Sequence, residues 1–173
     1  MKNRNKTKKD AKLIGKRALE ALRFQTHWGL KQRYGLSEEH CFHGLADVEI
    51  DLIGELNVTD ELLEIRRLVE NIDRHFHVAP IPDCGELIHS IVALALGIAQ
   101  TGQLGKIRMP FVMWEEQIKK KLITIYFSDE YRNQIVCLAK ENGYDTSTYL
   151  GQPVIKFNRL WVIIGRYKAK DNR

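Results

Sequence analysis

The chain has few cysteines, and it has no glycine-rich motif of the kind that binds phosphate. Of its 173 residues only three are cysteine (Cys41, Cys84 and Cys137), and no two of them form a CxxC pair. An odd number of widely spaced cysteines indicates reduced thiols in a cytosolic protein rather than a disulfide framework. No glycine-rich phosphate-binding motif is present, so the sequence gives no sign of a nucleotide-binding loop.

Long apolar segments are also missing. The N-terminus lacks the apolar core of a signal peptide. The longest apolar run, around residues 87–99, contains His89 and is too short to cross a bilayer comfortably. We therefore expect a soluble cytoplasmic protein that does not contact a membrane.

What the chain does have is an ordinary globular composition with an excess of positive charge. Hydrophobic residues make up 44% and charged residues 28%, and the length is sufficient for one domain with a core. The formal net charge is +5 and the isoelectric point is about 9.1. These values are compatible with nucleic acid or another anionic partner, but many proteins that bind neither share them.

The first two thirds of the chain have helical periodicity. Residues 1–10 are rich in lysine and arginine and have almost no apolar side chains, which predicts a disordered basic tail. Residues 11–114 predict a helical body. Within it, one helix starts at Thr59, and a second, buried helix covers about 85–100 after a proline-containing break.

The most informative stretch is ITIYFSDEYRNQIVCLAKENGYDTSTY, residues 123–149. It opens with the alternation of a strand and continues as a helix whose first turn carries Asp129 and Glu130. Asn142-Gly143 then ends that helix, and Asp145 can cap a second one. A single strand has no partner inside such a unit. A second copy would supply the partner and form a two-stranded antiparallel ribbon.

Residues 122–150, LITIYFSDEYRNQIVCLAKENGYDTSTYL, resemble the ribbon-helix-helix DNA-binding proteins of phages, plasmids and bacterial regulators. The strand, the acidic helix start, the turn and the capped second helix fall in register without a gap. The resemblance implies a homodimer whose ribbon enters the major groove of double-stranded DNA. The segment LRFQTHWGLKQRYG more loosely resembles the AcaB-type regulators of conjugative plasmid transfer. That likeness implies a transcriptional regulator on a mobile element.

The ribbon-helix-helix resemblance also implies which residues contact DNA. Outward positions of the ribbon would read bases, the start of the second helix would bind a phosphate through its amides, and lysines before the strand would neutralise further phosphates. These DNA-binding residues are Leu122, Thr124 and Tyr126 for bases, Thr146 and Ser147 for the helix start, and Lys119, Lys120 and Lys121 for phosphates. The alternate residues Ile123, Ile125 and Phe127 would pack inward onto the helices.

Gly151 and Pro153 interrupt the expected second helix within two turns. Either that helix is short and the chain continues as strands through VIKFNRLWVIIGRY, or the unit is a variant of the motif. The expected architecture is therefore α+β. It combines a mainly helical body with a ribbon-helix-helix-like unit and C-terminal strands over residues 115–173.

Other chemistries have weaker support in the sequence. The histidine pairs beginning at His40 and His75 do not have a recognised zinc-ligand spacing. The acidic pair Asp83 and Glu86 lacks the lysine that a metal-dependent nuclease would place nearby, and Cys137 lies between apolar residues and is expected to be structural. We therefore expect no metal, no cofactor and no catalysis.

Two readings without a DNA-reading ribbon remain open. The stretch at 123–149 could be an ordinary strand-helix piece of an α+β domain. The whole chain could instead be a non-enzymatic interaction or assembly component of a mobile element.

Overall fold

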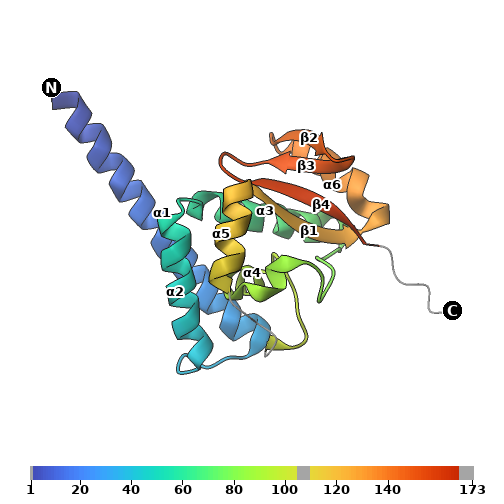
Figure 1. Ribbon diagram of the computed structural model, residues 1–173, viewed down its shortest axis with the longest axis horizontal. Helices are drawn as coiled ribbons and strands as arrows, with labels where there is room; N and C mark the ends of the chain where they lie inside the picture. Colours follow the sequence, from blue (N-terminus) through green and yellow to red (C-terminus); the bar gives the residue numbers. More distant parts are fainter. Residues whose placement is uncertain (1, 105–109, 168–173) are drawn as a thin grey trace.

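The fold combines a helical half with a four-stranded sheet in a computed structural model that describes residues 2–104 and 110–167 (Figure 1). The helical elements used below are α1 (Lys2–Tyr34), α2 (Cys41–Glu55), α3 (Thr59–Phe76), the short 3-10 helix η1 (Glu86–His89), α4 (Ile91–Leu96), α5 (Pro110–Lys120), the 3-10 turn η3 (Asp129–Tyr131) and α6 (Arg132–Glu141). The strands are β1 (Leu122–Ser128), β2 (Asp145–Tyr149), β3 (Gln152–Lys156) and β4 (Trp161–Tyr167). This mixture confirms the α+β class.

Helix α1 is longer than the sequence predicts. It begins at Lys2, so the described positions assigned to a disordered tail are helical, and its N-terminal half extends beyond the rest of the fold (Figure 1). No glycine or proline interrupts the helix before Gly15. At the other end Gly35 has a φ of 64°, and its amide donates to the carbonyl of Lys31 at 3.0 Å. This left-handed glycine is a common helix stop.

The helix predicted to start at Thr59 is confirmed as α3, and its apolar stripe is buried. The prediction of one helix over 85–100 is wrong. There the chain forms η1 and then the short α4, because the backbone of Ser90 between them is extended, with φ −96° and ψ 116°. Gly97, with a φ of 74°, ends α4. All six residues of α4 are buried, as predicted.

Strand β1 is not alone, because the sheet order is β1-β4-β3-β2. β1 pairs in parallel with β4 along its whole length, from Leu122 opposite Trp161 to Ser128 opposite Tyr167. β3 pairs antiparallel with both β4 and β2. The expectation of a strand without a partner in its own chain is therefore wrong. The premise that a second copy must complete a ribbon is removed with it.

The second helix expected from Asp145 is also wrong, because residues 145–149 form strand β2. Leu150 and Gly151 have φ angles of 49° and 75° and make the tight turn into β3. Two left-handed residues match the twist of a hairpin, and the threonine and tyrosine side chains of β2 favour a strand. Of the expected ribbon-helix-helix unit, β1 and α6 are present, and β2 takes the place of the second helix.

One face of the sheet packs onto the helices and forms the core. The prediction that Ile123, Ile125 and Phe127 point inward is confirmed, because all three are buried in the main hydrophobic cluster. The same cluster contains Ile155, Val162 and Ile164 from β3 and β4 and Ile65, Ile72, Ile135 and Leu138 from α3 and α6. In Figure 1, α3 lies behind the sheet. We call the opposite side of the sheet the outer face.

A buried carboxylate joins three helices of the helical half. Glu49 on α2 has no exposed surface, and it accepts hydrogen bonds from the hydroxyl of Ser90 and the indole N–H of Trp114 on α5. The amides of Ile91 and Val92, at the start of α4, donate to its other oxygen at 3.0 and 3.5 Å. Burial raises the pKa of Glu49, and these hydrogen bonds oppose the rise. Glu49 thus accepts from four buried donors, of which the Trp114 indole also donates to the hydroxyl of Ser90 at 3.2 Å.

Replacing Glu49→Ala is expected to lower the free energy of unfolding by about 3 kcal/mol, because several buried donors lose their acceptor at once. Trp114→Phe is the comparison, since it keeps most of the ring volume and removes one donor, and it should cost about 1 kcal/mol from the hydrogen bond. Urea unfolding followed by circular dichroism measures both. Equal losses for the two variants would show that Glu49 does not hold the helices together.

Candidate nucleic-acid interface

The lysines predicted to bind phosphates lie at one end of the sheet. Lys119 and Lys120 end α5, Lys121 precedes β1, and all three are exposed. Lys121 has a φ of 57°, which turns the chain from the helix into the strand. Its carbonyl accepts a hydrogen bond from the amide of Trp161 at 2.9 Å. Lys121 is therefore held next to Trp161, the first residue of β4, and Lys119 and Lys120 directly precede Lys121 at the end of α5.

Two further cations reach the same end, Lys156 from the last position of β3 and Arg159 from the connection between β3 and β4. Nζ of Lys156 lies 4.6 Å from the centre of the Trp161 ring, a cation–π distance. Arg159 donates from its amide to Glu61 at 3.0 Å and from its guanidinium to the carbonyl of Asn57 at 3.4 Å. We call the set of Lys119, Lys120, Lys121, Lys156, Arg159 and Trp161 the basic end. A groove of about 540 Å³ runs along it, and its lining includes Lys121, Arg159 and Trp161.

The sequence reasoning missed Lys156, Arg159 and Trp161. The segment KFNRLW carries the signal, because two cations and an aromatic residue flank a turn at Asn158-Arg159. Nothing local shows that this turn lies beside Lys121. Only the parallel pairing of β1 with β4 brings the two segments together.

Four of the predicted DNA-binding residues share the outer face of the sheet. Leu122, Thr124 and Tyr126 alternate with the buried set on β1 and are half-buried. The register places Thr124 in one row with Ile163, Val154 and the exposed Ser147. Thr146 alternates with Ser147 and belongs to the opposite face. The alternation along β1 thus correctly predicted that Leu122, Thr124 and Tyr126 share one face. Ser147 lies on the same face because residues 145–149 form strand β2, whereas the resemblance implied a helix there.

Thr146 and Ser147 do not lie at a helix start. They pair with Ile155 and Val154 in the antiparallel hairpin of β2 and β3. The prediction that their amides bind a phosphate at the start of a helix is therefore wrong, because no helix dipole acts there. Ser147 is exposed on the outer face, so its hydroxyl, and not its amide, is the group left for the expected contact with DNA.

Tyr126 is poorly placed to reach a base. Its ring lies between two glycines: a Cβ at Gly165 would meet ring atom Cδ1 at 2.7 Å, and one at Gly85 would meet Cε2 at 2.6 Å. Burial raises the pKa of the Tyr126 hydroxyl, and Cys84 and Glu86 raise it further. The amide of Ile81 also donates to the carbonyl of Tyr126 at 2.8 Å and covers the edge of β1. The accessible part of this face is therefore the part near Leu122, at the basic end.

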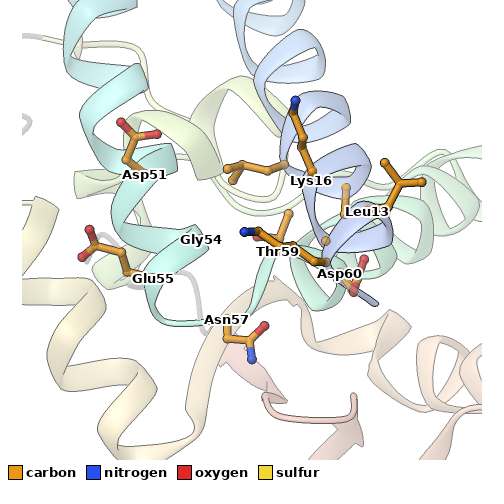
Figure 2. Close-up of a pocket in the computed structure, with 12 residues that line it drawn as sticks. Leu13, Lys16, Asp51, Gly54, Glu55, Asn57, Thr59 and Asp60 are labelled. Carbon is orange, nitrogen blue, oxygen red and sulfur yellow. The ribbon is translucent and has the colours of Figure 1, made fainter. Parts of the chain in front are cut away.

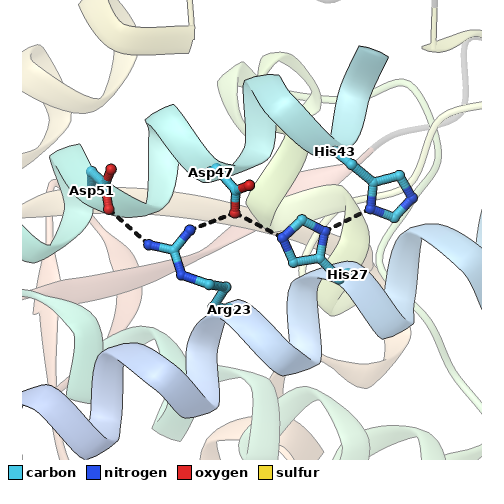
Figure 3. Close-up of polar contacts among 5 residues, drawn as sticks. All are labelled: Arg23, His27, His43, Asp47 and Asp51. Carbon is cyan, nitrogen blue, oxygen red and sulfur yellow. Dashed lines mark hydrogen bonds and ion pairs between the residues drawn. The ribbon is translucent and has the colours of Figure 1, made fainter. Parts of the chain in front are cut away.

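A second polar cluster joins α1 to α2 (Figure 3). His27 contacts Nδ1 of His43 through its own Nδ1 at 2.6 Å and Asp47 through Nε2 at 2.7 Å. Arg23 bridges Asp47 and Asp51, the latter at 2.8 Å. Sequence reasoning considered only His43 among these, as a metal ligand. The signal was the spacing of four residues from Arg23 to His27 on one helix and from His43 to Asp47 to Asp51 on the next.

In this cluster Nε2 of His43 is buried without a hydrogen-bond partner in the described part of the chain. Among residues 2–104 and 110–167, no three His, Cys, Asp or Glu side chains are placed to hold a metal ion. Within the same ranges, no helix has the length and apolar character needed to span a bilayer.

A groove of about 820 Å³ lies between α1 and the junction of α2 and α3 (Figure 2). Lys12 and Lys16 on α1 line it together with Asp51, Glu55 and Asp60 on the other side. The charges of the two sides are opposite, and the groove is open to solvent. It therefore has the character of an open seam between helices with charges of opposite sign on its two sides.

Asp47 makes the stability of the α1–α2 seam depend on pH. Partial burial alone would raise the pKa of Asp47, but hydrogen bonds from His27 and Arg23 outweigh it, and the pKa is lowered. The folded state therefore gains stability from Asp47 above the pKa of the unfolded chain, about 3.9, and loses it as the pH falls through the lower folded value.

Asp47→Asn is expected to cost about 1 kcal/mol at pH 7, because Asp47 is partly exposed and solvent screens the pair. The difference from the wild type should shrink at about pH 3.5, where unfolded aspartate is largely protonated. Urea unfolding at the two pH values measures this. A difference that does not change with pH would contradict the role of the Asp47 charge.

Comparison with known proteins identifies no relative, because no family model and no curated protein matches the chain.

Proposed function

We propose that the protein is a non-enzymatic, cytoplasmic DNA-binding protein that holds the phosphates of a duplex with its basic end. The observation that carries the proposal is the convergence of five cations, from the end of α5, the last position of β3 and the β3–β4 connection, beside Trp161. Regulation of transcription on a mobile element is the role that the ribbon-helix-helix and AcaB-type resemblances suggest. Within this proposal, the sheet replaces the two-chain ribbon as the element that approaches DNA.

The basic end has the chemistry for phosphate binding. Lysine and arginine that neutralise phosphates release condensed counterions, so binding weakens as salt rises. The positive charge is fixed, because Lys121 and Trp161 are joined through the backbone and Arg159 is tethered to Asn57 and Glu61. Asp145, opposite Lys156 on β2, is an acidic neighbour that weakens the local field.

Base contacts are expected from the part of the outer face next to the basic end. Leu122 and Thr124 are half-buried there, and the methyl groups of both side chains suit the methyl group of thymine. The Thr124 hydroxyl can also exchange a hydrogen bond with a base edge. Sequence preference should therefore be modest, with most of the affinity coming from phosphates.

An interaction or assembly component is the second candidate function. It is favoured by a different observation: Phe24 and Trp28 on α1 expose 69% and 54% of their surface. Large exposed aromatic side chains on a helix mark a surface that binds protein. This surface and the basic end are on different elements, so one protein can use both.

The triple variant Lys119→Gln/Lys120→Gln/Lys121→Gln should bind every duplex more weakly. The slope of log affinity against log salt should fall by about 2 to 3, because each lost phosphate contact removes about 0.9. Fluorescence anisotropy with a labelled random-sequence duplex at several salt concentrations gives this slope.

The matched control is Lys8→Gln/Lys12→Gln/Lys16→Gln, which changes the net charge equally but on α1. An equal fall in slope for both triples would mean that overall charge, and not the basic end, binds DNA. Asp145→Asn should act in the opposite direction and tighten binding. Wild-type protein that shows no salt-dependent binding to the duplex would exclude the function.

A further inference from the structure

Helix α1 exposes a continuous stripe on the side opposite to its buried face. Its buried side carries Leu22, Thr26 and Leu30, which contact the rest of the fold. The exposed stripe consists of Asp10, Leu13, Arg17, Glu20, Phe24 and Trp28, with Ile14 beside it. These positions are three or four residues apart, so they follow one another along one face of the helix.

The apolar members of the stripe have too much exposed surface for a helix that faces only water. Leu13 is 50%, Ile14 61%, Phe24 69% and Trp28 54% exposed. The rings of Phe24 and Trp28 are stacked 6.4 Å apart at 15°, and together they form one aromatic surface. Burying such side chains against a partner is worth roughly 1.5–3 kcal/mol for each large one.

The spacing of the stripe predicts what covers it. Asp10, Arg17 and Phe24 lie seven residues apart, as do Leu13, Glu20 and His27. This is the spacing of the contact positions of two helices that pack as a coiled coil, although only Leu13 and Phe24 of the six are apolar, so the other layers must be matched by charge. In an antiparallel pair, each position of the first series lies opposite a position of the second. Each residue of the stripe can therefore be compared with the residue that would lie opposite it in a second copy. We call each such facing pair a layer.

We propose that α1 packs antiparallel against α1 of a second copy, with the two-fold axis between Arg17 and Glu20. In this register Arg17 lies opposite Glu20 of the other copy, and by symmetry the same pair forms twice at the centre. On either side, Leu13 lies opposite Phe24 of the other copy. The outermost layers place Asp10 beside His27, whose ring nitrogens already contact His43 and Asp47 of their own chain. The complementarity therefore comes from the central Arg17–Glu20 pairs and from the Leu13–Phe24 layers.

The antiparallel direction is the one that brings opposite charges together at the centre of the stripe. A parallel pair would instead place Arg17 against Arg17 and Glu20 against Glu20.

The stripe is also free to receive a partner. The N-terminal half of α1 extends beyond the rest of the fold (Figure 1). Glu20 makes a contact of 3.9 Å with Lys16 of its own helix, and both of these side chains are largely exposed. Such an exposed pair is worth little, so Glu20 can turn to Arg17 of the second copy at small cost.

Sedimentation equilibrium of the full chain, without DNA, tests the proposal between about 1 and 100 µM, the range in which modest interfaces associate. The wild type should show a monomer–dimer equilibrium. Phe24→Glu/Trp28→Glu should weaken the dimer at least tenfold while circular dichroism stays unchanged, because both side chains are exposed. The matched control is Leu45→Glu/Val48→Glu, which alters equally exposed apolar residues of α2, at 43% and 53%, outside the stripe. It should leave the dimer intact.

Charge reversal tests the register. Arg17→Glu should weaken the dimer about tenfold, because two repelling Glu–Glu contacts replace two ion pairs. Glu20→Arg should do the same. The double variant Arg17→Glu/Glu20→Arg recreates both pairs with reversed sign and should return the dissociation constant to within about twofold of the wild type.

A monomeric wild type, or a dimer that tolerates Phe24→Glu/Trp28→Glu, would overturn the proposal. Failure of the double reversal to restore the dimer would overturn the antiparallel register. Because association is measured without nucleic acid, these outcomes are independent of DNA binding by the basic end.

Discussion

The buried carboxylate of Glu49 is the interaction on which the arrangement of the helices depends. One of its oxygens accepts from amides at the start of α4, where the helix dipole is positive and amides lack partners within the helix. The other accepts from Ser90 and from Trp114 on α5. A carboxylate in a hydrophobic core is costly unless such donors surround it, so α2, α4 and α5 can pack closely only in the orientation that satisfies Glu49.

Both candidate surfaces follow from that orientation. Helix α5 runs directly into Lys119, Lys120 and Lys121 and then into β1, so its position sets where the basic end lies. On its other side, α2 presents Asp47 and Asp51 to Arg23 and His27, which fixes the rotation of α1. This rotation turns Phe24 and Trp28 to solvent. A neutral residue at 49 would leave the local sequence of both surfaces unchanged and still disturb their placement.

The parts of the fold that the sequence predicted are those encoded by local periodicity. The stripe of α3, the inward side of β1 and the burial of residues 91–96 depend on spacing along one element, and all three predictions are confirmed. The failures concern residues whose conformation is set by distant partners. Ser90 interrupts a helical pattern because it caps α4 and donates to Glu49, which is 41 residues away in sequence. Asp145 begins a strand because β3 is available beside it.

In the candidate site, too, some residues were predictable from the local sequence and others depend on pairing with distant segments. The lysines before β1 were visible in the sequence, whereas Lys156, Arg159 and Trp161 join them only through the pairing of β1 with β4. Tyr126 was a reasonable base contact by alternation, but Gly85 and Gly165 leave space into which its ring packs. Glycine inside a strand often marks such a close approach. Gly165 was therefore the feature of the sequence that indicated a side chain packed against β4.

The two proposed surfaces together constrain how DNA would be bound. The ribbon dimer expected from the sequence, for which the pairing of β1 with β4 removes the reason, would place the two-fold axis at β1, beside the lysines, with the two sets of phosphate contacts adjacent. An antiparallel α1 pair instead places the axis between Arg17 and Glu20, on an element separate from the basic end. Both arrangements favour a DNA site with two-fold symmetry, because the symmetry of a dimer is mirrored in its operator. Symmetry of the site therefore cannot distinguish them. The spacing of the half-sites can, since it reports how far each basic end lies from the axis that relates them.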